Sequence, residues 1–201
     1  MGCTSADRAS TNPDSPTVAS EVAQLPQNQS RPAKSAETEC RTTDNLLKDT
    51  EFNRLFGGVW NYSQHTGPIS FDVTSDAGVL QVKRIGEEPY MVFSQRVPIP
   101  KQEGGRLKLL AEVKGALQAS PPLAMEIDMT AGLYLSSSLS QTGSYSNWAN
   151  HQPNTGDWDW RPILIEVEVA PGAAYAFAGV THSARGSIWM RRPVLVWTDC
   201  S

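Results

Sequence analysis

The chain has 201 residues, of which 39% are hydrophobic and 19% are charged, and its formal net charge is −4. This length fits one domain with an attached tail, and the negative charge argues against nucleic acid as a partner, because nucleic-acid-binding domains commonly carry a basic patch. No apolar run approaches the roughly 18 residues that a membrane-spanning helix needs. We therefore expect contact with a membrane only through a lipid anchor.

The first 40 residues are rich in Ser, Thr, Pro, Asn and Gln, and they show no sustained hydrophobic period. Such a composition predicts disorder. We interpret residues 1–40 as a flexible tether and residues 41–201 as the folded domain. Cys40 stands at this boundary and Cys200 is the penultimate residue. A disulfide between them would join the two ends of the domain and would indicate an oxidising compartment; the alternative is two free thiols.

Short segments with period-2 alternation begin beyond residue 60, and they predict about nine short strands and no amphipathic helix. The clearest is at 106–114, where Leu107, Leu109, Ala111 and Val113 occupy alternate positions. In chain order the runs lie at 69–73, 78–85, 89–97, 106–114, 125–135, 163–169, 174–181 and 186–198. This spacing is typical of an all-β sandwich.

The segment before residue 163 is rich in Ser, Asn and Gly, and we interpret it as a long loop. It carries Tyr145, Trp148, His151 and Trp158. Sugar rings stack their C–H faces on aromatic planes, and their hydroxyls need polar partners. Aromatic side chains in a polar loop beside a β scaffold therefore indicate a recognition surface, with a loop that packs on itself as the alternative.

Several motifs resemble the carbohydrate-binding modules of the galactose-binding-like superfamily. These motifs are Asn45-Leu46-Leu47 with Gly58-Val59-Trp60, Phe93-Ser94-Gln95-Arg96-Val97, Gly156-Asp157-Trp158 with Val169-Ala170-Pro171-Gly172, and Gly186-Ser187-Ile188-Trp189-Met190 with Val194-Leu195-Val196. The resemblance covers residues 44–199. It implies a jelly-roll β-sandwich that binds a polysaccharide or oligosaccharide, with Trp60 and Trp189 as core residues. Trp197, near the end of the chain, is expected to pack in the core as well.

Some members of this family carry a structural calcium ion. The closing strand often has an acidic pair where this chain has Arg191-Arg192, which argues against that calcium site. His65, His151 and His182 show no metal-ligand spacing. We expect no cofactor, with structural calcium as the alternative.

The predicted ligand-binding residues are aromatic or acidic. They are Tyr134, Tyr145, Trp148, Trp158, Trp160, Glu126, Asp128 and Glu166. Tyr134, Glu126 and Asp128 share the non-core positions of one predicted strand, and Trp160 has the same parity as Glu166. Trp158 has a structural role as its alternative, because the family has a Trp at this position that is often structural.

The acidic residues leave a catalytic alternative open. A glycoside hydrolase needs two carboxylates that flank the scissile bond. Glu126, Asp128, Glu166 and Glu168 would supply such a pair if their strands were neighbours. Acidic residues at alternate positions are otherwise typical of a solvated strand face.

The start Met-Gly-Cys-Thr-Ser, followed by a polar segment, resembles a mature bacterial lipoprotein. The resemblance implies lipidation of Cys3 and a place at the bacterial cell envelope, at the outer membrane or in the periplasm, with secretion as the alternative. Myristoylation of Gly2 would favour Ser or Thr where the chain has Ala6, and a cysteine without a role is the remaining possibility.

The leading functional prediction is non-catalytic carbohydrate binding at the envelope through an aromatic and polar face. The alternatives are an envelope lipoprotein adaptor that binds a protein partner, and a polysaccharide-cleaving enzyme.

Overall fold

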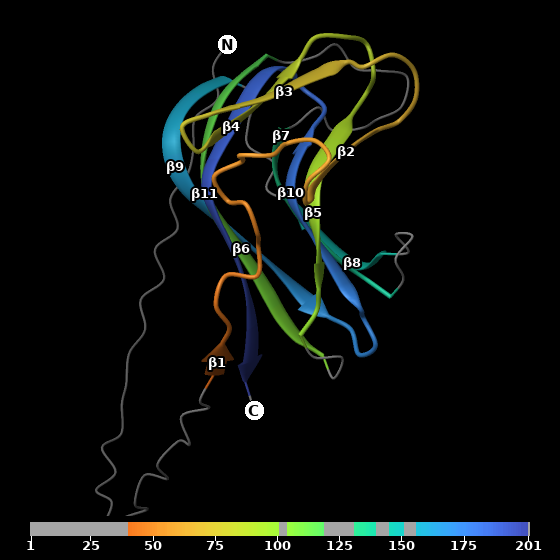
Figure 1. The fold of residues 1–201 in the computed structure, drawn as a ribbon, viewed down its shortest axis with the longest axis vertical. Coiled ribbons are helices and arrows are strands. Elements are labelled where there is room, and N and C mark those ends of the chain that lie inside the picture. Colours follow the sequence, from red (N-terminus) through yellow and green to blue (C-terminus); the bar gives the residue numbers. More distant parts are fainter. Residues whose placement is uncertain (1–39, 101–103, 119–130, 140–144, 151–155, 201) are drawn as a thin grey trace, which may run out of the picture. The chain divides into compact units, whose positions relative to one another are not determined.

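The computed structural model describes residues 40–100, 104–118, 131–139, 145–150 and 156–200. All regular structure in these ranges is β-strand, arranged in two antiparallel sheets (Figure 1). The predicted all-β jelly-roll sandwich is confirmed. Among the described residues, no helix has the length and apolar character needed to cross a membrane.

The two sheets have six and five strands. Sheet A has the order β3 (Phe71–Asp76), β4 (Val79–Arg84), β11 (Arg185–Cys200), β6 (Gly105–Gln118) and β9 (Gly156–Val169), with β1 (Cys40–Thr42) paired to β11. Sheet B has the order β2 (Trp60–Gln64), β5 (Met91–Pro98), β10 (Tyr175–His182), β7 (Ala131–Ser138) and β8 (Tyr145–Asn150). The chain passes from sheet A in β9 to sheet B in β10 and back in β11, as in Greek-key jelly rolls.

The described residues form eleven strands, where the sequence predicted about nine. The loop interpretation of the segment before residue 163 is wrong for three of its aromatic residues. Tyr145 and Trp148 lie in β8, and Trp158 lies in β9, which begins at Gly156. The backbone of β8 pairs with that of β7. Strand pairing uses main-chain groups, so a Ser- and Asn-rich composition does not prevent it, although strand propensity disfavours it.

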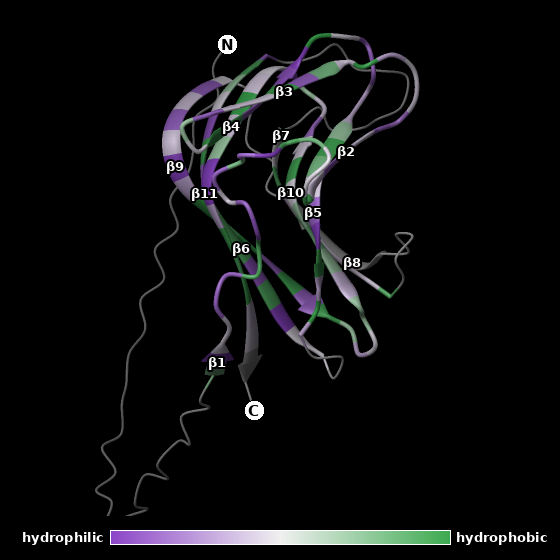
Figure 2. Ribbon diagram, in the orientation of Figure 1, coloured by the Kyte–Doolittle hydropathy of each residue, from purple (hydrophilic) through white to green (hydrophobic). Residues whose placement is uncertain are grey.

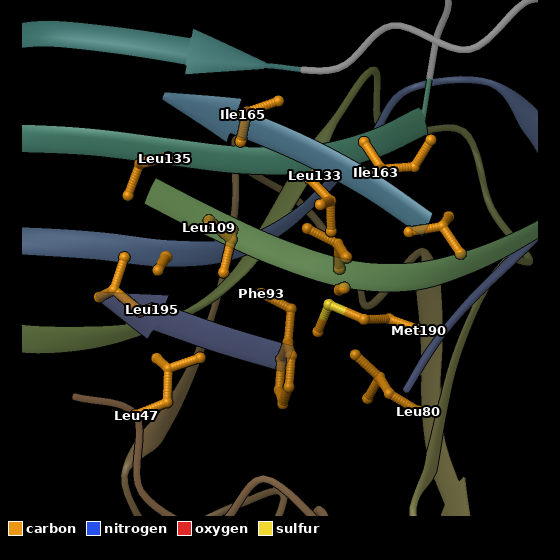
Figure 3. Packing of buried hydrophobic residues seen from close by; sticks show 14 of the residues in the cluster. Leu47, Leu80, Phe93, Leu109, Leu133, Leu135, Ile163, Ile165, Met190 and Leu195 are labelled. Atoms are coloured by element: carbon orange, nitrogen blue, oxygen red, sulfur yellow. The ribbon is translucent and has the colours of Figure 1, made fainter. Parts of the chain in front are cut away.

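The core lies between the sheets, and Figure 2 shows hydrophobic and hydrophilic residues alternating along the strands. Leu107 and Leu109 of β6 are fully buried, as the alternation predicted, and Leu133 and Leu135 of β7 are buried as well. Figure 3 shows Leu109, Leu133 and Leu135 in this cluster. Burying a large aliphatic side chain contributes about 1.5–3 kcal/mol. The first part of the run predicted at 125–135 lies outside the described residues.

Aromatic rings fill one end of the core. Trp60 stacks on Phe93, with ring centroids 5.4 Å apart and planes 8° from parallel, and Phe52 lies 5.2 Å from Trp60. The indole Nε1 of Trp60 donates to the carbonyl of Asp49 at 3.0 Å. Trp60 is therefore a core residue, as predicted, and Trp197 is buried as well.

Trp189 is not a core residue, in contrast to the prediction. Its neighbours Ile188 and Met190 are buried, whereas Trp189 is half-buried. Alternate residues of a strand point to opposite faces. Trp189 therefore faces outward from sheet A.

β11 contains a bulge and changes partner along one edge. It pairs with β4 over Ser187–Arg191 and with β1 over Thr198–Cys200. The bulge lies between Arg191 and Val194, where Arg192 has a φ of 52°. The extra residue interrupts the ladder and re-aims the strand between its two partners.

The register of β1 places Cys40 directly opposite Cys200. Three residues further along the same ladder, the backbone N–H of Thr43 donates to the carbonyl of Trp197 at 3.0 Å, so Thr43 and Trp197 form a hydrogen-bonded pair. Because the two pair types alternate, Cys40 and Cys200 form a non-hydrogen-bonded pair, whose Cα atoms are typically about 4.5 Å apart. That spacing fits a disulfide. The side chain of Cys200 lies outside the described residues, so the Cys40–Cys200 disulfide stays a prediction.

Candidate functional site

The outward surface of sheet B presents aromatic residues beside polar ones. In β10, Ala176, Ala178 and Val180 are fully buried in the core. The residues between them therefore face outward. We call this surface the β10 face; it comprises Arg96, Tyr134, Ser136, Tyr175, Phe177 and Gly179.

The register of three strands arranges these residues in rows. Phe177 lies between Arg96 of β5 and Ser136 of β7. In the next row, Gly179 lies between Ser94 and Tyr134. Residues directly opposite each other in antiparallel strands share a face. The β10 face therefore has an aromatic side chain in its first row and no side chain at the centre of its second.

Gly179 also sets how closely β10 approaches β5. A Cβ atom at this position would lie 2.1 Å from the carbonyl oxygen of Phe93. Any side chain here would push the two strands apart. The position between Ser94 and Tyr134 therefore has to be a glycine if β10 and β5 are to pair this closely.

The polar groups of the β10 face contact its rings. The guanidinium carbon of Arg96 lies 5.1 Å from the ring centroid of Tyr175, a cation–π contact, and Arg96 remains exposed. Tyr134 Oη donates to Ser136 Oγ at 2.9 Å. The face thus combines half-buried aromatic rings with an exposed guanidinium and the hydroxyl of Tyr134, whereas Ser136 beneath it is fully buried. This combination suits a ligand that has apolar C–H faces and many hydroxyls.

Three of the predicted ligand-binding residues come together at one edge of sheet B. Tyr134 lies in β7, and the neighbouring strand β8 holds Tyr145 and Trp148. The register pairs Trp148 with Ser136 and Tyr145 with Ser138. The side chains of β8 lie outside the described residues. The backbone nevertheless places both aromatic residues beside the row that contains Phe177.

Three other predicted residues lie apart from these, on β9 in sheet A. Trp158 is half-buried against the core, and its ring covers Gly115, where a Cβ would lie 2.1 Å from ring atoms. The guanidinium carbon of Arg161 lies 5.0 Å from its ring centroid. These contacts give Trp158 a structural role, the alternative that the sequence left open. Its ligand role stays untested.

Trp160 and Glu166 face outward from sheet A. The guanidinium carbon of Arg191 lies 4.3 Å from the ring centroid of Trp160. Glu166 forms ion pairs with Lys108 at 3.0 Å and with Arg106 at 3.5 Å. Both predicted residues are thus held by cations of the protein itself. Glu126 and Asp128, which complete the predicted set, lie outside the described residues.

Of the four carboxylates considered for hydrolysis, two, Glu166 and Glu168, lie in the described part of the chain. Glu166 and Glu168 lie on β9 in sheet A, and both pair with Arg106. The strand that follows Glu126 and Asp128, β7, belongs to sheet B. Within the described ranges, no group of three or more His, Cys, Asp or Glu residues is placed to hold a metal ion.

Of the six residues of the β10 face, the sequence analysis predicted only Tyr134; the missed residues include Arg96, Tyr175 and Phe177. The segment 174–181 was predicted as a strand, and its small residues Ala176 and Ala178 mark the inward positions. The alternation therefore contained the signal that Tyr175 and Phe177 face outward. Aromatic residues are common in strands, so their type alone does not mark them as site residues.

The chain matches no protein-family model and no curated protein. Among solved structures, it superposes on the enzymatically active domain of tailspike protein 4 of bacteriophage CBA120, with a TM-score of 0.57 and 16% identity. That match covers 76% of this chain and 21% of the tailspike chain, so this chain spans about a fifth of its length.

Carbohydrate-binding modules are among the other matched structures. The CBM22-1 xylan-binding domain of Paenibacillus barcinonensis Xyn10C has a TM-score of 0.47 and 15% identity, with 79% of this chain and 97% of that chain covered. TmCBM61, solved in complex with β-1,4-galactotriose, has a TM-score of 0.43 and 14% identity, with 79% and 100% covered. At these identities the likeness is one of fold.

Proposed function

We propose that this domain binds a polysaccharide or oligosaccharide, without catalysis, through the β10 face and the adjoining strand β8. The observation that carries the proposal is the outward placement of Tyr175 and Phe177 beside the exposed guanidinium of Arg96. Aromatic planes next to directional hydrogen-bond donors are the groups that a pyranose recognises. The modules named above bind xylan and β-1,4-galactotriose, and they motivate the choice of probes.

The ligand would cross the strands rather than follow one of them. The rows that contain Phe177 and Gly179 run from β5 through β10 to β7, and β8 continues them. A glycan chain lying along these rows would stack on Phe177 and Tyr134. Arg96 would donate hydrogen bonds to its hydroxyls.

A glycan array probed with the full chain, once with calcium and once with EDTA, tests this proposal. We expect binding to at least one glycan class. For a glycan that binds, Phe177→Ala and Tyr175→Ala should weaken the affinity about tenfold or more, which corresponds to about 1.4 kcal/mol. Val92→Ala is the matched control, because Val92 lies on the same side of β5, four residues from Arg96.

Other outcomes would reject the proposal. A blank array in both conditions, together with capture of one stoichiometric protein, would favour the adaptor function. Release of reducing ends or unsaturated sugars that is lost in Glu126→Gln or Asp128→Asn would identify a polysaccharide-cleaving enzyme. Binding that occurs only with calcium would not reject saccharide binding; it would show that binding requires a calcium ion, as the resemblance allows.

We also propose that Cys3 carries a lipid and that residues 1–40 tether the domain to a bacterial envelope. The Met-Gly-Cys-Thr-Ser start and the polar composition support this. A flexible chain of this length reaches on the order of 35 Å, from about 5–6 Å × √n. Labelling with a palmitate analogue in a bacterial host should mark the wild type and not Cys3→Ser, and equal labelling of both would reject the anchor.

A further inference from the structure

We propose that the outward face of sheet A carries a second saccharide-binding subsite, centred on Trp189 and specific for a neutral sugar. This site lies on the opposite sheet from the β10 face and shares no residue with it. It does not depend on the proposed function of that face.

Strand register builds the site. Thr74 of β3 is paired with Gln81 of β4, and Gln81 is paired with Trp189 of β11. The next row on the same face pairs Asp76 with Val79, and Val79 with Arg191 of β11. Because residues in such rows share a face, the neighbouring strands β4 and β3 place the polar side chains of Gln81, Thr74 and Asp76 on one side of the indole.

A pocket lies where these two rows meet. Its volume is about 400 Å³, and its lining is formed by Thr74, Ser75, Asp76, Ala77, Val79, Gln81 and Trp189. This volume is within the range of about 300–1,000 Å³ that is usual for small-molecule sites. Five of the seven residues belong to the two rows, whose sixth member, Arg191, does not line the pocket. The pocket therefore follows from the pairing of β3, β4 and β11.

Trp189 is held in place from the side away from the pocket. Lys114 of β6 is its register partner, and the ammonium Nζ of Lys114 lies 5.9 Å from the ring centroid of Trp189. Lys114 in turn pairs with Asp159 at 3.8 Å. The pocket is lined by Gln81 and not by Lys114. The indole therefore has a cation on one flank and a polar hollow on the other.

The lining selects a class of ligand. It contains one carboxylate, Asp76, and no basic side chain. Arg191, which shares the second row, is already paired with Glu112 and stacked on Trp160, and it does not line the pocket. An anionic sugar would therefore face Asp76 without a cation in the lining to compensate its charge, which is unfavourable. A neutral pyranose would stack its C–H face on Trp189, give a hydroxyl proton to Asp76, and exchange hydrogen bonds with Gln81 and Thr74.

Titration of the ¹⁵N-labelled full chain tests the subsite, because tryptophan indole N–H signals report on each ring separately. The probes are xylohexaose, cellohexaose and β-1,4-galactotriose, each up to about 10 mM, which detects dissociation constants in the millimolar range. Trp189→Phe assigns the Trp189 signal by its loss. We expect that signal to move with at least one of the three probes.

Affinity measurements on variants then separate the two faces. Trp189→Ala should lower affinity at this subsite about tenfold or more, and the pair Gln81→Ala and Thr74→Val should lower it while leaving the indole in place. Leu164→Ala is the matched control, because Leu164 is an exposed residue of the same sheet, outside the pocket. Thermal unfolding of each variant shows whether the fold is retained.

The outcomes for the two faces are distinguishable. A Trp189 signal that does not move with any of the three probes overturns the second subsite, whatever Phe177→Ala does. A Trp189 signal that moves in Phe177→Ala as it does in the wild type supports the subsite, even if the β10 face proves to bind no sugar. The second subsite would also be overturned if, in the double variant Gln81→Ala with Thr74→Val, the Trp189 signal still moved and the affinity were unchanged.

Discussion

The side-chain amide of Asn45 donates a 3.0 Å hydrogen bond to the carbonyl of Pro193, across 148 residues of chain. Its Oδ1 atom accepts from the backbone N–H groups of Leu195 at 2.9 Å and Leu47 at 3.1 Å. Pro193 lies in the bulge of β11, where the backbone ladder is interrupted. The side-chain amide of Asn45 therefore satisfies backbone groups of β11 in the stretch between its pairing with β4 and its pairing with β1, where no described strand pairs with β11 on that side.

Replacing Asn45 by Ala should lower the free energy of unfolding by about 1–3 kcal/mol, because three hydrogen bonds are lost at once. Asn45→Asp should cost less, since its carboxylate still accepts from Leu195 and Leu47. The bond to Pro193 becomes a contact between two oxygen acceptors, which solvent partly screens at this exposed residue. Urea unfolding of both variants measures the difference. Equal destabilisation by Ala and Asp would show that the acceptor atom contributes nothing.

Acid should destabilise the domain through His182. Burial lowers the pKa of His182 to about 4, from an ordinary value of 6.5. Its Nε2 lies 3.3 Å from the carbonyl of Gly186, which can only accept, so Nε2 carries the proton and Nδ1 has no partner. Between these two pKa values the unfolded chain binds a proton that the folded chain does not. Stability is therefore complete above about pH 6.5 and falls as the pH decreases toward 4.

We expect a loss of about 2 kcal/mol between about pH 7 and pH 5, from the cost of 1.36 kcal/mol per pKa unit. The hydrogen bond from Arg191 lowers the pKa of Glu112 below 4.5. Protonation of this carboxyl therefore changes the stability only at a lower pH than the two compared here. Urea unfolding at both pH values measures the loss. His182→Gln should be less stable overall and should lack most of the pH dependence; an unchanged slope in this variant would assign the effect to another group.

Gly115 and Trp158 should be energetically coupled. Gly115→Ala places a Cβ about where the Trp158 ring now lies, at 2.1 Å from ring atoms, and overpacking of this kind typically costs about 1–3 kcal/mol. Trp158→Leu frees that space at the cost of buried area. The double variant should lose clearly less free energy of unfolding than the two single variants lose together. Strict additivity, measured by urea unfolding, would mean that the ring does not lie against Gly115.

The register of β1 with β11 makes the predicted Cys40–Cys200 disulfide directly testable. In protein produced without lipidation of Cys3, alkylation of the unfolded chain without a reductant should modify one thiol, that of Cys3, and three after reduction. In the chain-entropy model, a cross-link across this length of chain stabilises the folded state by about 5 kcal/mol. Cys200→Ser and a reductant should therefore lower the unfolding midpoint similarly. Modification of three thiols without a reductant would exclude the bond.

The sequence allowed the layers of the fold to be predicted, because alternation along β6 and β7 reports directly on which residues are buried. It did not allow every side chain to be assigned to a face. Trp158 and Trp160 have the same parity, yet Trp158 packs on the core and Trp160 faces outward. A bulge between Val113 and Gly115 in the pairing of β6 with β9 shifts the register between them, and no local pattern announces such an insertion.

The candidate site was predicted less completely than the fold. Tyr134 was placed correctly on a strand face, because its neighbours Leu133 and Leu135 are unambiguous core residues. Trp189 was assigned to the core by resemblance, although Ile188 and Met190 already occupied the inward positions. Which strands lie side by side depends on non-local pairing, and so the meeting of Phe177 with Arg96 could not be derived from either segment alone.

The pairing of β1 with the last residues of β11 also determines how the domain would respond to mechanical load. The two strands are antiparallel, and Cys40 and Cys200 lie side by side at their outer end. A pull on the chain before Cys40, opposed by a pull at Cys200, would separate this pair first and then open the ladder one rung at a time, the weakest geometry for a sheet. A covalent bond between the two residues would carry that force directly from one strand to the other and leave the sandwich unloaded.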